Sequence, residues 1–138
     1  MMQFEYFEME EIVTFHSKMI KKYKGLRGLR EMGLLVSVVN NPKMTFDGKQ
    51  LYPDVFAKSA CYLYGIVKNH PFIDGNKRTG SFVAYLFLRK HGVIPPPLDL
   101  YEELVVKVAD GKVSMEEVAE FFRSFNQKSE GSYEHLGK

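Results

Sequence analysis

Residues 70–88 read HPFIDGNKRTGSFVAYLFL, a short polar loop followed by seven consecutive apolar residues, 82–88. A run of this kind could form a buried strand or a helix that is apolar on all sides. The residues that follow favour the helix, because the basic residues at 89–91 complement the negative end of a helix dipole and Gly92 suits a left-handed stop. Counted from Asn76, we expect a mostly buried central helix of about four turns.

The N-terminus of this helix would face the polar loop. First-turn N–H groups of a helix have no intrahelical partner and carry partial positive charge, so they bind anions. Lys77 and Arg78 add two full charges at the same place, and Gly75 permits a positive φ or a close backbone approach to a ligand. The sequence therefore predicts a phosphate-binding site at the start of the helix.

The loop itself contains groups with complementary chemistry. His70 can accept a proton near neutral pH and suits a general base for a hydroxyl group, whereas Asp74 is a hard oxygen ligand for Mg²⁺ carried on a nucleotide phosphate. We expect Pro71 to keep His70 extended, and Phe72 to point inward and hold the loop to the core. A base, a metal ligand and an anion site within nine residues match the needs of phosphoryl or nucleotidyl transfer, in which positioning and charge neutralisation dominate.

Each of these residues also has a purely structural interpretation. His70 could cap a helix or pack, Asp74 could be an N-terminal cap, and Lys77 and Arg78 could form a solvated first turn. Their clustering at the start of a buried helix favours a functional site. A Walker A loop is excluded, because residues 75–78 lack the G-x(4)-G-K-(S/T) spacing.

The segment HPFIDGNKR, residues 70–78, resembles the signature H-P-F-x-(D/E)-G-N-G-R-x-x-R of the Fic/Doc superfamily. Lys77 replaces a glycine of that pattern and Ser81 stands in place of its second arginine; the Doc-type (death on curing) toxins share both departures. Gly75 is Fic-like, since Doc has alanine there. Two further Doc-like segments are GLRGLREMGLL (25–35) and LYPD (51–54).

This resemblance implies an all-α Fic/Doc-like fold with one small hairpin, and an ATP-dependent transferase that acts on a protein hydroxyl. Fic enzymes usually transfer AMP, whereas Doc binds ATP inverted and transfers the γ-phosphate to elongation factor Tu. We favour γ-phosphoryl transfer; AMP transfer, which Gly75 allows, and a non-enzymatic binding module are the alternatives. In the Doc-like interpretation His70 is the catalytic base and Asp74 holds Mg²⁺. The residues that would bind the phosphates are Gly75, Asn76, Lys77 and Arg78.

The resemblance also bears on regulation. Fic proteins that inhibit themselves carry the pattern (S/T)-x-x-x-E-(G/N) on an inhibitory helix. The nearest segment here is NQKSEG, residues 126–131, which begins with Asn instead of Ser or Thr. We therefore expect inhibition by a separate antitoxin-like protein, as for Doc.

The rest of the chain reads as helices and one hairpin. Apolar spacing predicts helices at about 8–23, 31–40, 53–68, 98–109 and 114–125. Gly25 would end the first of these helices, Asp54 would lie in the first turn of the third, and Ser114 with Glu117 would form a capping box. His16 lies on the apolar stripe of the first helix, where a packed core histidine is the favoured interpretation.

The pair Asp47-Gly48 predicts a β-hairpin within residues 44–51, although a loose surface loop is the alternative. In Fic relatives a small hairpin flap beside the active site holds the target segment by main-chain pairing. By this resemblance, the target-positioning flap would consist of Thr45, Phe46, Asp47 and Gly48.

Composition is typical of one globular domain. The chain has 138 residues, 45% of them hydrophobic, which suits a single domain at 1–125 followed by a polar, flexible tail at 126–138. The net charge of +2 gives no indication of a nucleic-acid or membrane partner. Cys61 is the only cysteine, so we expect a core residue and no internal disulfide. The acidic N-terminus is unlike a signal peptide and no segment reaches the ~18 apolar residues of a membrane helix, so a cytoplasmic protein is expected.

Overall fold

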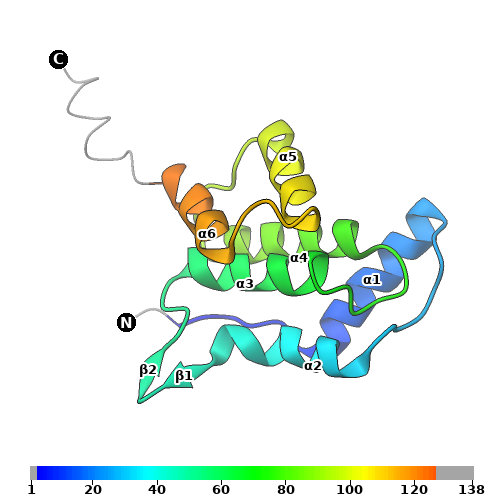
Figure 1. Cartoon of the computed structure of the whole chain (residues 1–138), viewed down its shortest axis with the longest axis horizontal. Coiled ribbons are helices and arrows are strands. Elements are labelled where there is room, and N and C mark those ends of the chain that lie inside the picture. The colour runs from blue at the N-terminus through cyan, green and yellow to red at the C-terminus, as the bar shows by residue number, and fades with distance from the viewer. Residues whose placement is uncertain (1–2, 127–138) are drawn as a thin grey trace.

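A computed structural model describes residues 3–126 (Figure 1). Its elements are, in chain order, α1 (Met9–Tyr23), α2 (Met32–Asn40), the 3-10 helix η1 (Asn41–Lys43), β1 (Thr45–Phe46), β2 (Lys49–Gln50), α3 (Val55–Val67), α4 (Asn76–Lys90), α5 (Leu98–Ala109) and α6 (Met115–Ser124). The expected helical fold with one small hairpin is confirmed. Within the described residues, no helix is long and apolar enough to cross a bilayer.

Helices α3 and α4 form the centre of the molecule, with α1 and α2 on one side and α5 and α6 on the other (Figure 1). The central pair approaches most closely at Gly80, where a Cβ atom would lie only 2.5 Å from Cγ2 of Val67. The apolar run 82–88 is therefore helical, as predicted. It is not buried on all sides, because Phe82 is 36% exposed. Its fully buried members are Val83, Ala84, Phe87 and Leu88.

Apolar side chains fill both sides of this central pair. The cluster against α5 and α6 includes Leu63, Leu88, Leu104, Val108 and Phe122. The cluster against α1 and α2 includes Phe7, Ile12, Leu35, Phe72 and Phe87. Cys61 is a free, buried core residue, as expected, and burial raises the pKa of its thiol to about 12, so this thiol is unreactive at neutral pH.

Two helix caps differ from the sequence prediction. Lys24 rather than Gly25 is the left-handed residue that ends α1, with a φ of 61°, and the N–H of Gly25 donates to the carbonyl of Ile20 at 3.1 Å. Asp54 is the N-cap of α3 and not a first-turn residue, because its Oδ1 accepts the N–H of Ala57 at 2.8 Å. Helix α1 still ends at Tyr23, as predicted, whereas the Asp54 cap makes α3 begin at Val55, two residues later than predicted.

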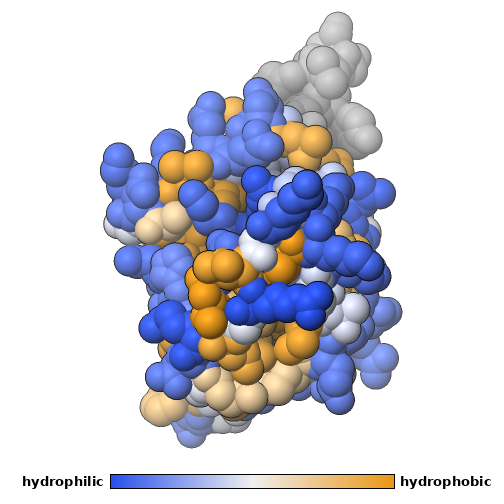
Figure 2. Space-filling view, turned by 90° about the vertical axis from the view of Figure 1, so that its right-hand side faces the viewer, coloured by the Kyte–Doolittle hydropathy of each residue, from blue (hydrophilic) through white to orange (hydrophobic). Residues whose placement is uncertain are grey.

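Apolar residues also gather on the surface at one end of the molecule. Figure 2 shows the side that faces right in Figure 1, with hydrophobic residues near its middle and hydrophilic residues around and among them. The α1–α2 loop and the α3–α4 loop both turn towards this side. Their exposed apolar residues include Leu26, which is 67% exposed, Leu29, and Ile73, which is 53% exposed.

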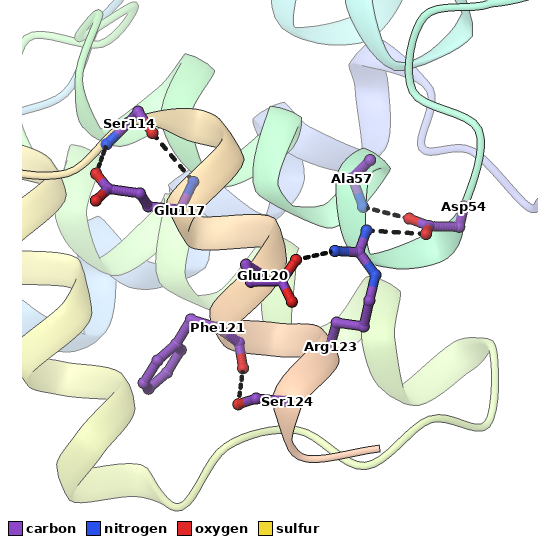
Figure 3. Close-up of polar contacts among 8 residues, drawn as sticks. All are labelled: Asp54, Ala57, Ser114, Glu117, Glu120, Phe121, Arg123 and Ser124. Carbon is purple, nitrogen blue, oxygen red and sulfur yellow. Dashed lines mark hydrogen bonds and ion pairs between the residues drawn. The ribbon is translucent and has the colours of Figure 1, made fainter. Parts of the chain in front are cut away.

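Helix α6 is fixed at both ends by polar contacts (Figure 3). The predicted capping box is present: Ser114 Oγ accepts the N–H of Glu117 at 3.1 Å, and Glu117 Oε1 accepts the N–H of Ser114 at 2.7 Å. Further along, Arg123 donates to Asp54 Oδ2 at 2.9 Å and to Glu120 Oε1 at 2.7 Å. The first of these pairs ties α6 to the N-cap of α3.

The predicted hairpin is present between α2 and α3. Its strands pair antiparallel, with Thr45 opposite Gln50 and Phe46 opposite Lys49. The two turn residues, Asp47 and Gly48, have φ angles of 54° and 76°. Two consecutive positive φ angles are the geometry that an Asp-Gly pair favours in a two-residue hairpin turn.

The polar tail predicted at 126–138 lies outside the described residues, except for Asn126. The same is true of the segment NQKSEG that resembles an inhibitory motif. The side chain of Asn126 accepts the N–H of Ile94 at 2.8 Å and donates to the Ile94 carbonyl at 2.9 Å. The chain is therefore held against the α4–α5 connection at this point.

Candidate active site

The loop between α3 and α4 contains His70, which lies three residues after the end of α3 and is exposed. His70 has a left-handed backbone with a φ of 58°, and its N–H donates to the carbonyl of Ile66 at 3.2 Å. The expectation that Pro71 keeps His70 extended is therefore wrong. The reason is local, because His70 follows the end of α3 and its left-handed conformation lets its N–H reach one of the last carbonyls of that helix.

Arg30, from the α1–α2 loop, holds the backbone at this strained position. Its Nε donates to the carbonyl of His70 at 2.6 Å and its Nη2 to the carbonyl of Asn69 at 2.7 Å. The backbone N–H groups of Arg30 and Glu31 both donate to the carbonyl of Pro71, at 2.8 and 3.1 Å. Sequence reasoning gave Arg30 no role, although it lies in the Doc-like segment 25–35.

The middle of the loop is closed by Phe72 and Asn76. The Phe72 ring points into the core and is 2% exposed. Asn76 Oδ1 accepts the N–H of Phe72 at 3.0 Å, and Asn76 Nδ2 donates to the Phe72 carbonyl at 2.9 Å. Because the Asn76 amide is engaged at both ends and 7% exposed, the group of Asn76 best placed for a phosphate is its backbone N–H.

His16, on α1, packs against the α3–α4 loop. It is buried, as expected for a packed histidine, and its ring stacks on Phe72 with centroids 3.7 Å apart and an interplanar angle of 6°. Its Nε2 lies 2.8 Å from the carbonyl oxygen of Asp74 and must carry the proton that this acceptor needs. His16 is thus a second supporting residue that sequence reasoning missed.

The carboxylate of Asp74 is held by backbone donors. Its Oδ2 accepts the N–H of Leu26 at 2.9 Å and its Oδ1 accepts the N–H of Gly75 at 2.8 Å. These two hydrogen bonds hold the pKa of Asp74 below its usual value near 3.8, so the side chain is ionised at neutral pH. The contact with the α1–α2 loop requires Gly25, because a Cβ there would lie 2.7 Å from Asp74 Oδ2.

Asp74 fits a metal that brings most of its own ligands. Each of its oxygens accepts one N–H group and retains a lone pair for coordination. No cluster of three or more His, Cys, Asp or Glu side chains that could hold a metal occurs within residues 3–126. Mg²⁺ is commonly held by one or two carboxylates, with phosphate oxygens and water completing its octahedron, so one carboxylate beside a phosphate site suits it.

Helix α4 begins with an open N-terminus. Gly75 is the N-cap, with a φ of 76°, and among residues 3–126 no side chain caps the helix. A Cβ at Gly75 would lie 2.9 Å from Cδ1 of Ile20, the end of a flexible side chain, so glycine is favoured here mainly by the positive φ. The outward-facing N–H groups of Asn76, Lys77 and Arg78 form the kind of site that binds phosphate.

Lys77 and Arg78 are exposed and line a pocket of about 570 Å³ between α1, α4 and α5. The guanidinium of Arg78 lies over the ring of Tyr23, with 3.7 Å between Cζ and the ring centroid. A volume of this size is within the range of small-molecule sites. Other residues of the pocket wall are Met19, Ser81, Phe82, Tyr85 and Tyr101.

The hairpin Thr45–Gly48 is not close to these residues. It lies at the N-terminal end of α3, whereas His70 follows its C-terminal end (Figure 1). At 1.5 Å per residue, α3 separates the two by about 20 Å. The segment that does lie beside the loop is 26–31: Gly28 accepts the N–H of Ile73 at 3.0 Å, and Leu29 and Phe72 form an antiparallel bridge.

Comparison with known proteins gives consistent matches. A family model described as Fic/DOC family matches residues 6–88 of the chain. Protein kinase doc of Escherichia phage P1 is 32% identical over 114 residues, a region that covers 83% of this chain and 90% of that protein. Toxin Doc of Mycolicibacterium smegmatis is 32% identical over 118 residues, which cover 83% and 88% of the two chains.

Proposed function

The chain belongs to the Fic/DOC family, and from this premise we propose that it is a Doc-like toxin that transfers the γ-phosphate of ATP to a protein hydroxyl. The two relatives, one named a protein kinase and the other a toxin, support this proposal. The structural observation that carries it is the uncapped N-terminus of α4 with its two cations, facing a loop that presents an exposed imidazole and an ionised carboxylate.

ATP would bind with its phosphates at the start of α4. The backbone N–H groups at Asn76, Lys77 and Arg78, together with the two side-chain charges, neutralise the phosphate oxygens. Asp74 would contribute a carboxylate oxygen to Mg²⁺ on the nucleotide. The bound metal would offset charge that develops on the phosphate oxygens.

His70 would act as the general base. Its unprotonated ring nitrogen takes the proton of the target hydroxyl as the hydroxyl oxygen bonds to the γ-phosphorus. The bond between the γ-phosphorus and the β–γ bridging oxygen breaks, and ADP leaves with the electron pair. Arg30 and the left-handed conformation fix the backbone of His70, which limits the positions that its imidazole can reach before the target binds.

Two departures from the Fic pattern favour γ-phosphoryl transfer over AMP transfer. Lys77 occupies a position where glycine would leave space for the α- and β-phosphates, and its ammonium can hold a phosphate group elsewhere. Ser81 lacks the guanidinium that the Fic pattern supplies there. Gly75 is the observation that keeps AMP transfer as a second candidate, because a Fic-type residue is present at the N-cap of α4.

The target and the inhibitor are proposed by analogy. Elongation factor Tu is the target that the Doc resemblance suggests, and an antitoxin-like protein is the inhibitor that a toxin requires. The segment 26–31 is better situated than Thr45–Gly48 to hold a target segment, because its backbone pairs with Phe72 and Ile73 beside the candidate base. The target-positioning role of the hairpin stays a prediction.

The proposal is tested by incubating the purified protein with a bacterial lysate and ATP labelled at the γ-phosphate. We expect transfer of the label to protein, and we expect His70→Ala to slow this transfer by ~10²–10⁴, as is typical for loss of a general base. The melting temperature of the variant should stay within a few degrees of wild type, because His70 is exposed. Transfer at a near-normal rate by His70→Ala would contradict the assignment of the base.

A further inference from the structure

A second pocket lies between α1 and the α1–α2 loop, and it reaches the candidate loop at Phe72. Its volume is about 280 Å³, which is below the usual range for a small-molecule site but sufficient for one large side chain. Its wall is mostly apolar, with Val13, Ile20, Leu29 and Phe72. Phe72 belongs to the loop that carries His70, so an occupant of this pocket lies next to the candidate active site.

The charged residues of this pocket are all basic. Lys21 and Arg27 line it, and both are exposed. They belong to the segment 18–30, which contains six basic residues and no carboxylate, whereas the rest of the chain has 13 basic against 17 acidic residues. The ionised Asp74 lies close to this segment, since its Oδ2 accepts the N–H of Leu26, but one carboxylate does not offset six basic residues. The surface around the pocket therefore attracts an acidic partner.

The surroundings favour a protein over a nucleic acid. The exposed side chains of Leu26, Leu29 and Ile73 adjoin the pocket and the loop. An exposed apolar surface of this kind suits contact with another protein. Single-stranded nucleic acids are bound by aromatic faces on which bases stack. The rings of residues 3–126 that line this pocket are His16 and Phe72, and they are stacked face to face on each other.

We propose that this pocket receives a large apolar side chain from an acidic segment of the protein substrate, and so helps to select the hydroxyl presented to His70. The identification of the occupant as the protein substrate rests on the proposed function. Segment 27–29 forms one wall of the pocket, and Arg30, the next residue, holds the His70 carbonyl. An anchored side chain thus fixes the register of the substrate relative to the base.

Peptide binding without ATP tests the pocket separately from catalysis. The probes are fluorescein-labelled peptides with one phenylalanine flanked by glutamates, versions with alanine for the phenylalanine or lysines for the glutamates, and a single-stranded oligothymidylate. We expect the acidic phenylalanine peptide to bind at least about tenfold more tightly than either altered peptide, since burial of one phenylalanine contributes roughly a factor of this size or more. Equal binding of the phenylalanine and alanine peptides, tighter binding of the oligonucleotide, or binding of none of the probes would overturn the proposal.

Three variants connect the binding to this pocket. Ser17→Trp fills it from an exposed position of its wall and should remove the preference for phenylalanine. The double variant Lys21→Glu with Arg27→Glu should weaken binding of the acidic peptide at least tenfold and reduce its salt dependence. Lys107→Glu, an exposed position on α5, is the matched control and should bind like wild type. Circular dichroism checks that each variant is folded, and Val13→Trp replaces Ser17→Trp if the latter is not.

Labelling in the lysate then separates this inference from the proposed function. Ser17→Trp should lower transfer of the γ-label to protein at least about tenfold while its calorimetric affinity for ATP stays unchanged. If transfer persists at the wild-type rate in this variant, the pocket inference fails and the phosphotransferase proposal stands. If the wild-type protein binds the acidic peptide but transfers no label, the phosphotransferase proposal fails and the pocket remains a protein-binding site.

Discussion

Replacing Arg30 with methionine should both destabilise the protein and slow the reaction proposed for it. Methionine keeps a long apolar side chain but removes the guanidinium that donates to the carbonyls of Asn69 and His70 at 2.7 and 2.6 Å. These two hydrogen bonds hold the chain where His70 adopts a left-handed backbone, a conformation that costs an L-residue roughly 1–2 kcal/mol. Without them, the loop can relax away from the observed geometry.

The expected loss follows from these contacts. A hydrogen bond to a charged group contributes about 1.5–3 kcal/mol when it is shielded, but Arg30 is exposed and water can replace it at both carbonyls. We therefore expect the free energy of unfolding to fall by about 1–2 kcal/mol in total. For a domain of this size, that corresponds to a drop of roughly 4–8 °C in melting temperature. A displacement of the base by about 1 Å would lower the transfer rate about 10²-fold.

Urea denaturation, thermal melting and transfer of the γ-label measure these effects on one set of variants. Arg27→Met is the matched control for stability, because Arg27 lies in the same loop and donates no hydrogen bond recorded within residues 3–126. Calorimetry with ATP should give the same affinity for Arg30→Met and wild type, since the proposed phosphate site is at α4 and does not include Arg30. If Arg30→Met is no less stable than Arg27→Met and transfers label at the wild-type rate, Arg30 does not position His70.

Lys77→Ala and Arg78→Ala should each weaken ATP binding by about 1.5–3 kcal/mol in a calorimetric titration with Mg²⁺, and unchanged affinity in both would mean that the nucleotide binds elsewhere. The hydrogen bonds that ionised Asp74 accepts stabilise the folded protein. Their contribution is fully present above pH 3.8, the ordinary pKa of the group, and is lost as the pH falls through the lower pKa that Asp74 has in the folded state. Asp74→Asn should therefore flatten the acid side of the stability–pH curve and weaken the Mg²⁺ dependence of ATP binding, whereas an unaltered curve would show that these bonds contribute nothing. At position 70, glycine should give a protein about 1 kcal/mol more stable than alanine in urea denaturation, because the φ of 58° disfavours a Cβ; equal stability would contradict the left-handed backbone.

Local sequence signals predicted much of this fold. The central helix was recognisable from the apolar run 82–88 and its basic C-terminal end, and the capping box of Ser114 and Glu117 from the spacing of two residues. The hairpin turn was recognisable because Asp47-Gly48 supplies two residues that tolerate positive φ. Each of these signals depends on residues close together in the sequence, where the rules of caps and turns apply directly.

The supports of the candidate site were not predictable in this way. The Arg30 side chain donates to the carbonyl of a residue 40 positions further along the chain, and the His16 ring contacts a carbonyl 58 positions away. Patterns among neighbouring residues do not predict such contacts. The rule for residues before proline predicts an extended His70, but the nearby end of α3 imposes a left-handed backbone instead. The sequence pattern predicts Gly25 only as a helix stop, whereas in the structure a Cβ at Gly25 would also crowd the carboxylate of Asp74.

The central claim is that the γ-phosphate moves, and parallel incubations with ATP labelled at the α- or the γ-phosphate test it most directly. The purified protein and its His70→Ala variant are each added to a bacterial lysate with one of the two labels, and labelled proteins are separated by electrophoresis. We predict protein labelling from γ-labelled ATP alone, and its loss in His70→Ala. Labelling from α-labelled ATP would show AMP transfer, and no labelling from either nucleotide would show a binding module; both results contradict the account.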